Sequence, residues 1–395
     1  MKLQAIVLAA CTMLAVLARA EDRTIHIGDL YEDSGLNTSI PGAEALNPYM
    51  HEHAAAAMWA DKGGVFEQGG IGCDCDSCDS GCDVGCDSAC GCDSCGGCSK
   101  RSSCGPRWSF IGEALYLERR GTPRIPLLMA APGFPIGTSR ALVTSQDVKT
   151  RFKLGYRATV IRHGLFGGGS DLEVSYFQID SFKARAVVGG PGNGIAFDRI
   201  IAPVATAGPT RFNFGSDIYS GEANLRRRIN NRFTFLGGFR WIELGEGYLA
   251  QDTGGANPFY ATDTNNHLYG GQFGVDMRAM GGENGSINIV AKGGVFGNYA
   301  DQSSFQNYAP GFSATTGGSD FQTSLLWEAA VNCRIRMNEL FFIQAGYQVM
   351  WLNGLALASE QVIHNDFANA YGGTLVNTGG SLFYHGGFLG LVGTW

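Results

Sequence analysis

The segment that most constrains the fold of this chain is Ser381 to Trp395. Counting back in twos from Trp395, one row of side chains contains Leu391 and Leu389, and the other row contains Phe388. A period of two predicts a β-strand, and this strand has no polar tail. Such a strand must pair with a partner, and pairing with the first strand would close the sheet into a barrel that has no edges.

The composition agrees with a wall of strands. Glycine makes up 58 of 395 residues, and 16% of residues are charged; typical soluble proteins have about 7% glycine and about 25% charged residues. After residue 20 the sequence has no uninterrupted apolar run of about 18 residues, the length that a membrane-spanning helix requires. Any crossing of a membrane is therefore expected to be made by strands.

Residues 1–20 have the pattern of a secretory signal peptide. An apolar run from Leu3 to Leu17 lies between Lys2 and the small-x-small sequence ARA at residues 18–20. This arrangement is typical of a cleaved signal. An alternative is a lipoprotein cleavage box at residues 8–11 (LAAC), which would leave a shorter apolar run than such signals use.

The charge distribution divides the mature chain at Arg107. Residues 21–107 hold 15 acidic and 5 basic residues, a net charge of −10, whereas residues 108–395 hold 21 acidic and 22 basic residues, a net charge of +1. We therefore expect an acidic, low-complexity N-terminal segment over 21–107 and a β-barrel over 108–395.

The acidic segment carries a dense group of cysteines at CxC, CxxC and CxxxC spacings, which match no single zinc motif. It lacks the apolar residues that a core needs, so we expect a largely disordered arm. In an oxidising compartment the thiols would form disulfides within a tether, or to other copies or envelope proteins; a metal-loaded segment and a plain spacer stay open. The cysteines are Cys73, Cys75, Cys78, Cys82, Cys86, Cys90, Cys92, Cys95, Cys98 and Cys104.

Segments of period two follow one another from Trp108 onward. In Val148 to Ala158, the apolar residues alternate with basic ones, which no helix would separate in this way. Most segments reach the 9 to 11 residues that a tilted strand needs to cross a bilayer. Strands are expected near 108–119, 148–161, 170–183, 214–229, 232–244, 266–279, 286–298, 322–336, 339–352 and 381–395.

The connections between these segments alternate between long and short. The short ones are 162–169, 230–231, 280–285 and 337–338. Outer-membrane barrels have long loops at one rim and short turns at the other, whereas a β-sandwich does not sort its connections in this way. We therefore predict an all-β, closed antiparallel up-and-down transmembrane barrel of ten to twelve strands. An even number places both ends of the barrel at the periplasmic short-turn rim, so the acidic segment is expected to lie in the periplasm or to fold into the lumen.

Basic residues recur on one face of several predicted strands: Lys149, Arg151, Lys153, Arg157, Arg226, Arg228, Arg334 and Arg336. On a barrel this face should point to the lumen, because a charge on the lipid face costs about 2 to 4 kcal/mol at the midplane. They either pair with luminal carboxylates and fill the interior, or form a positive pore lining that favours anions.

Several motifs carry a resemblance to a known family. They are GYQVMWLNGLALASEQ (346–361), FLGGFRWIEL (235–244), NNHLYGGQFG (265–274), AKGGVFGN (291–298) and YHGGFLGL (384–391). In this order they resemble the β-barrel porin family of planctomycete-type bacteria, over roughly residues 108–395. The resemblance implies an outer-membrane location and an N-terminal extension, often cysteine-rich, but it supplies no catalytic or binding residues.

No pattern in the sequence points to catalysis. It contains neither GxSxG nor HExxH nor a phosphate-binding GxxxxGK[ST] loop, so we expect neither an enzyme nor a cofactor, and no nucleic-acid partner. The expected function is passive, porin-like passage of small hydrophilic solutes across an outer membrane. The alternative is a structural envelope protein, in which the barrel anchors a disulfide-cross-linking arm, since ten strands make a narrow lumen that side chains can fill.

Overall fold

The computed structural model describes residues 107–121, 124–129, 141–165, 170–188, 194–195, 209–252, 259–282, 284–309, 312–365 and 375–395. The predicted signal peptide and the ten cysteines between Cys73 and Cys104 lie outside these residues. Within them, no helix is both long and apolar enough to cross a bilayer.

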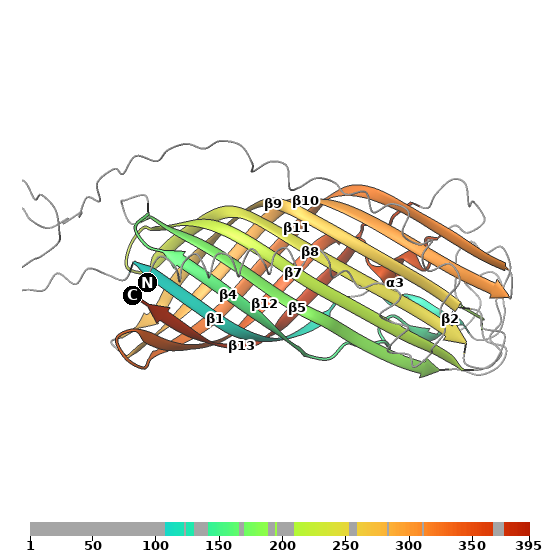
Figure 1. The fold of residues 1–395 in the computed structure, drawn as a ribbon, viewed down its shortest axis with the longest axis horizontal. Coiled ribbons are helices and arrows are strands. Elements are labelled where there is room, and N and C mark those ends of the chain that lie inside the picture. The colour runs from blue at the N-terminus through green and yellow to red at the C-terminus, as the bar shows by residue number, and fades with distance from the viewer. Residues whose placement is uncertain are drawn as a thin grey trace, which may run out of the picture. The chain divides into compact units, whose positions relative to one another are not determined.

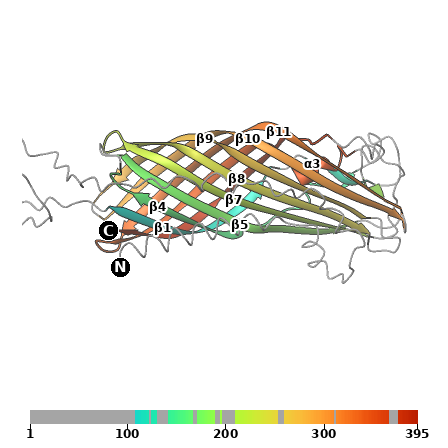
Figure 2. The same cartoon turned by 45° about the horizontal axis from the view of Figure 1, so that its top comes forward.

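Ten strands form one closed antiparallel barrel, as the sequence predicts (Figures 1 and 2). Neighbours in the chain are neighbours in the wall, apart from the small strands that are not part of it. The wall strands are β1 (Trp108–Arg120), β4 (Lys153–Arg162), β5 (Ser170–Val188), β7 (Thr210–Arg228), β8 (Phe233–Asp252), β9 (Phe259–Gly281), β10 (Gly285–Ala309), β11 (Phe312–Arg336), β12 (Phe341–Leu355) and β13 (Gly380–Thr394).

The seam between the first and the last strand closes the barrel. Ser109 pairs with Thr394 in antiparallel register. Backbone hydrogen bonds join Trp108 and Trp395 in both directions, at 2.9 and 3.0 Å. The rings of Phe110 and Trp395 stack with centroids 4.6 Å apart. The start of the first wall strand and the end of the last one therefore lie at the same rim, the one that carries the short turns.

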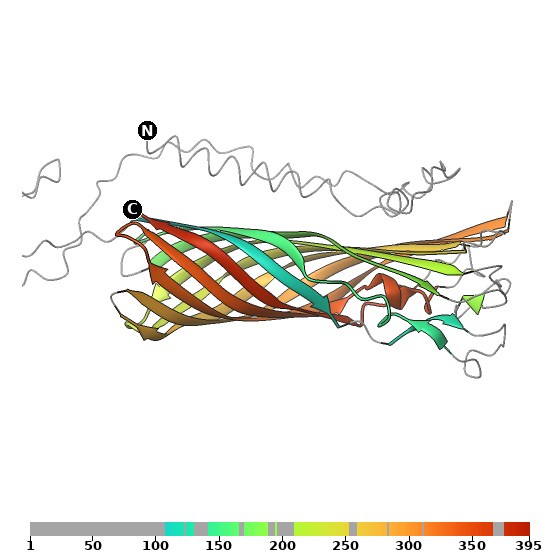
Figure 3. The ribbon, with the colours of Figure 1, turned by 90° about the horizontal axis from the view of Figure 1, so that it is seen from below.

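The described parts of the longest connections lie at the other end of the barrel. Strands β2 (Pro126–Met129), β3 (Ala141–Thr144) and β6 (Gly194–Ile195) form a separate three-stranded sheet, so the hairpin inside the first long connection adds nothing to the wall. The short helix α3 (Ala358–Gln361) follows β12, and all four of its residues are buried. Figure 3 shows α3 in red and the strands β2 and β3 in teal at the end of the barrel away from the C-terminus.

One expected strand begins later than predicted. The expectation covered residues 148–161, but β4 starts at Lys153, which pairs with Leu117. Residues before it are held in a turn, because the Asp147 carboxylate accepts hydrogen bonds from the Thr144 amide and hydroxyl, both at 2.8 Å. Apolar and basic residues therefore alternate across residues 148–152, although these residues do not form a β-strand.

The expected alternation of connection lengths is also wrong at two places. Only residues 310–311 separate β10 from β11, and only residues 253–258 separate β8 from β9. Residues expected in a long loop instead continue the antiparallel ladder, with Ser303 opposite Gly317. Outside the membrane, backbone N–H and C=O groups can form hydrogen bonds with a neighbouring strand as well as with water. On the long-connection side, the wall strands therefore extend as a sheet beyond the barrel part that was expected.

The outer wall of the barrel is apolar. Large hydrophobic side chains point outward on nearly every strand, including Phe273, which is 66% exposed, and Leu389, which is 60% exposed. Polar pairs bound this band on the long-loop side, where the His385 imidazole lies 3.3 Å from the Glu118 carboxylate. From Phe110 to Glu118 the wall rises roughly 20 Å for tilted strands, close to the ~25 Å apolar band of transmembrane barrels.

Candidate functional site

The barrel interior is layered along its axis. The inward row of β1 runs from Ser109 at the short-turn rim through Glu113, then Leu115 and Leu117, to Arg119. These side chains are buried, and they change from charged to apolar and back to charged. The interior therefore consists of a charged chamber, an apolar layer and an upper polar network.

The charged chamber has a volume of about 320 Å³ and lies on the short-turn side of the apolar layer. Its walls carry both signs of charge. The carboxylates are Glu113, Asp171, Glu173, Glu222, Asp276 and Glu328, and the cationic residues are Arg157, Arg226, Arg228, Arg232, Arg278, Lys292 and Arg334. Six negative and seven positive groups leave the chamber close to electrical balance.

Ion pairs at the inner end of the chamber join both neighbouring strands and strands that lie apart in the wall. The Arg240 guanidinium on β8 lies 2.7 Å from the Glu328 carboxylate on β11 and 3.7 Å from that of Glu222 on β7. Lys292 on β10 lies 2.6 Å from Glu222. The Arg240 side chain is 2% exposed, so this charge is removed from water and depends on its partners.

The eight basic residues singled out in the sequence separate into two groups. Arg157, Arg226, Arg228 and Arg334 line the chamber. Arg157 pairs with Glu113 at 3.3 Å, and Arg226 pairs with Glu173 and with Asp276.

The other four are not among the lining residues. Lys149 and Arg151 precede β4 and are exposed, and Lys153 is half-buried at its first position. Arg336 is exposed at the turn after β11, where its Nε donates to the Asn338 carbonyl at 3.2 Å. A role of any of the eight in a pore stays a prediction.

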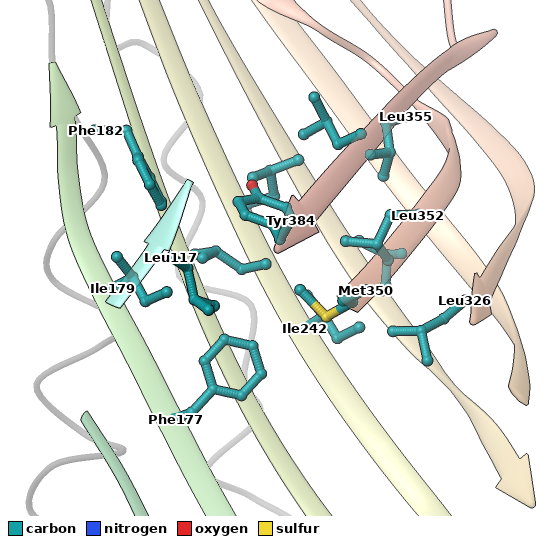
Figure 4. Packing of buried hydrophobic residues seen from close by; sticks show 14 of the residues in the cluster. Leu117, Phe177, Ile179, Phe182, Ile242, Leu326, Met350, Leu352, Leu355 and Tyr384 are labelled. Atoms are coloured by element: carbon teal, nitrogen blue, oxygen red, sulfur yellow. The ribbon is translucent and has the colours of Figure 1, made fainter. Parts of the chain in front are cut away.

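An apolar layer fills the bore above the chamber. Nearly all of its side chains come from the wall strands, and Figure 4 shows part of this cluster. Arg240 packs against this layer, with its guanidinium 5.7 Å from the centre of the Phe177 ring. Residues of the layer that are at most 6% exposed include Leu115, Leu117, Phe177, Ile179, Phe182, Ile242, Leu326, Met350, Leu352 and Tyr384. In this conformation the layer separates the chamber from the other half of the barrel.

A polar network above this layer holds the chain that follows β12. The Asn266 side chain bonds both backbone groups of Ala356, at 2.8 and 2.7 Å. The Glu246 carboxylate accepts from the Ala358 amide at 3.1 Å and is paired with Arg119. Wall residues thereby position α3 inside the bore.

Glu360 on α3 has no ion-pair partner among the described residues. Its side chain is buried and accepts a hydrogen bond from Asn377 Nδ2 at 3.3 Å. Burial raises the pKa of Glu360 to about 7, with a further contribution from the negative charge of Glu246 and an opposing one from Arg119. The protonation of this carboxyl group near neutral pH therefore depends on how deeply α3 is buried in the bore.

A cluster that sequence reasoning missed lies on the outer wall. The Glu243 carboxylate is 2.5 Å from His267 Nδ1, and Asp301 is 3.8 Å from His267 Nε2. The register of β8, β9 and β10 places Glu243 opposite His267 and Asp301 beside it. Correct pairing of these strands would have been enough to identify the cluster from the sequence. Because its side chains point outward, we interpret it as part of the membrane boundary and not as a site in the lumen. No group of acidic, His and Cys residues suited to a metal ion occurs in the part of the chain that the structure describes.

The chain matches no known family model, and no curated protein is similar to it in sequence. The resemblance to the planctomycete-type porin family is therefore not confirmed.

Solved structures of outer-membrane proteins match this chain at low similarity. The outer-membrane protease OmpT of Escherichia coli is 10% identical, with a TM-score of 0.40, over 73% of this chain and 96% of that one. The toluene transporter TodX of P. putida is 7% identical (TM-score 0.28; 73% and 89% covered), and a FadL homologue of Pseudomonas aeruginosa is 9% identical (TM-score 0.27; 73% and 89% covered). At these values the neighbours carry no argument about function, and the fold assignment rests on the strand topology: this chain is a closed ten-stranded antiparallel barrel of the transmembrane type.

Proposed function

We propose that the protein is an outer-membrane barrel with a closed bore, which anchors its cysteine-rich N-terminal segment in the cell envelope. The apolar outer wall supports a place in lipid. The layer that fills the bore supports a barrel that does not conduct in this conformation.

The apolar layer is the observation that carries this proposal. Apart from Leu357, it is made by side chains of the wall strands, such as Leu117 on β1 and Phe177 on β5. Removal of the chain around α3 would therefore leave the bore closed. An ion that crossed the layer would lose its water without finding polar partners, which costs several kcal/mol or more.

The place where the N-terminal segment joins the barrel supports an anchoring role. The Arg107 carbonyl accepts a hydrogen bond from the His163 amide at 2.9 Å, at the short-turn rim. Short turns of outer-membrane barrels face the periplasm, so the acidic segment would start on that side. Cross-linking of its cysteines to other copies or to envelope proteins is the sequence-based part of this proposal.

A second candidate function is porin-like passage of small hydrophilic solutes. The charged chamber favours it, because its volume of about 320 Å³ and its balanced charges would accept a hydrated solute from one side. Passage would then require the apolar layer to move aside.

Conductance in planar lipid bilayers tests the closed bore. The wild-type protein should pass no measurable current, whereas Leu117→Gly combined with Phe177→Gly should raise conductance, because both side chains lie in the layer. Phe273→Gly on the outer wall is the matched control and should change nothing. A wild-type protein that conducts steadily would reject the closed bore and favour the porin.

A non-reducing gel of the native envelope tests the anchor separately. Covalent multimers or adducts that disappear on reduction are expected. Monomer alone under both conditions would reject cross-linking.

A further inference from the structure

The mouth of the charged chamber carries cations that form no ion pair with a carboxylate of the described residues. Each of the six chamber carboxylates is engaged by a basic side chain: for instance, His163 contacts Asp171 at 2.9 Å, and Arg157 contacts Glu113 at 3.3 Å. By contrast, four lining arginines have no carboxylate within 4.0 Å in the described chain: Arg228, Arg232, Arg278 and Arg334. The positive charge is thus gathered at the mouth although the chamber as a whole is near balance.

These arginines converge from neighbouring parts of the wall. Arg228 ends β7, Arg232 lies in the turn to β8, Arg278 is on β9 and Arg334 is on β11. The Arg278 amide donates to the Arg232 carbonyl at 2.7 Å, so these two residues are adjacent. The Arg334 guanidinium lies close enough to interact with the like charges of Arg226 and Arg278, and also with the opposite charges of Asp276 and Glu113. Cations held this close together repel one another, and an anion between them would relieve the repulsion.

Arg334 is held in place by a neutral partner, which leaves part of its guanidinium free. Its Nη2 and Nε both donate to Gln344 Oε1, at 2.8 and 3.2 Å, and Gln344 Nε2 donates in turn to Glu113 at 2.8 Å. A guanidinium has five N–H donors in a planar fork that suits phosphate oxygens. The remaining donors are available to a ligand in the chamber.

The same chamber offers acceptors as well as donors. The buried amide oxygens of Asn288 and Asn332, both lining residues, accept no hydrogen bond from the described residues. Hydroxyl groups are the complementary donors. The volume of about 320 Å³ lies in the range of small-ligand pockets.

We propose that the chamber mouth is a binding site for a small phosphorylated, hydroxyl-bearing solute, whose phosphate lies among Arg278, Arg334 and the neighbouring Arg228 and Arg232. The hydroxyl groups face Asn288, which lies opposite Arg278 in the wall, and its neighbour Asn332. The test of this site measures ligand binding and not ion conductance. Its outcome is therefore independent of whether the bore is closed.

Isothermal titration calorimetry on the full chain, in dodecylmaltoside micelles that contain no phosphate, tests the site. Glucose 6-phosphate should bind more tightly than inorganic phosphate, and glucose should not bind. Each of Arg278→Gln and Arg334→Gln should weaken glucose 6-phosphate binding about tenfold or more, as expected for one charge-assisted contact. Circular dichroism of each variant verifies that the barrel is folded.

Arg336→Gln is the matched control, because Arg336 lies two residues from Arg334 but outside the chamber lining. It should change the affinity by less than about twofold. Absence of glucose 6-phosphate binding, or equal weakening in the Arg336 and Arg334 variants, would overturn the site. Loss of binding when phosphatidylglycerol is added to the micelles would assign the phosphate to a lipid headgroup and overturn the assignment to a free solute.

Discussion

Substitution of the buried Arg240 should lower the free energy of unfolding of the barrel strongly. It joins Glu328 and Glu222 inside the wall, and its side chain is 2% exposed against 10% for Glu328. Arg240→Met keeps most of the volume and the packing against Phe177, but it removes the charge. Glu222 would retain Lys292, at 2.6 Å. Glu328 would be left without its closest cation.

The expected loss is about 3 to 5 kcal/mol in the free energy of unfolding, the usual cost when one partner of a buried pair is removed. A second change that neutralises the abandoned carboxylate, Arg240→Met with Glu328→Gln, should recover at least half of it. The matched control is Arg120→Met, because Arg120 pairs with Glu118 at 2.8 Å but is 62% exposed. An exposed pair of this kind contributes about 0 to 1 kcal/mol.

Equilibrium unfolding of the reconstituted barrel in urea, followed by tryptophan fluorescence, measures all three variants. If Arg240→Met and Arg120→Met lose the same small amount, the interior pair is not desolvated and the description of the chamber's inner end is wrong. A double variant that is less stable than Arg240→Met alone would contradict the argument that an unpaired carboxylate causes the loss.

Three further predictions concern the long-loop end, the wall and the seam. Because the pKa of Glu360 is raised to about 7 from 4.5, the folded protein binds more protons between these values and should lose stability as the pH rises through that window. The hydrogen-exchange protection factors of the α3 amides, which are corrected for the intrinsic pH dependence of exchange, should fall from about pH 5 to about pH 8 in the wild type but stay level in Glu360→Gln. An equal fall in both proteins would refute this. A Cβ on Gly270 would lie 2.1 Å from the Val295 carbonyl oxygen, whereas one on Gly271 meets nothing closer than 4.0 Å, so Gly270→Ala should lower the urea midpoint clearly and Gly271→Ala hardly at all; similar midpoints would contradict the close approach of the strands. Deletion of Trp395 removes two backbone hydrogen bonds and one stacked ring from the seam, and should reduce the folded fraction on a heat-modifiability gel, whereas an undiminished folded band would argue against a seam closed there.

The wall of the barrel could be predicted from the sequence because side chains with a period of two indicate β-strands directly. Every wall strand overlaps an expected segment, and the closure of Ser381 to Trp395 against the first strand is confirmed. The prediction failed where a local interaction or an extended pairing overrode the pattern, at residues 148–152 and in the projecting part of β10 and β11. Period two reports an extended chain, but it does not say whether the chain is paired.

The interior could be predicted only in part. Arg157, Arg226 and Arg334 were assigned to the luminal face, and they line the chamber. The apolar layer was not foreseen, because both rows of a strand such as β1 carry apolar residues: Leu115 points inward and Tyr116 outward. Which charges meet depends on the stagger of strands around the whole barrel, and no single segment encodes it.

The buried ion pairs have a consequence for how the barrel enters a membrane. Arg240 and Glu328 are 88 residues apart in sequence, and Gln344 reaches Glu113 across a separation of 231 residues. A hairpin that entered the bilayer alone would carry these charges without their partners, at a cost that lipid does not offset. The strands of this barrel are therefore expected to cross the membrane together, with closure and insertion as one event rather than a succession of hairpins.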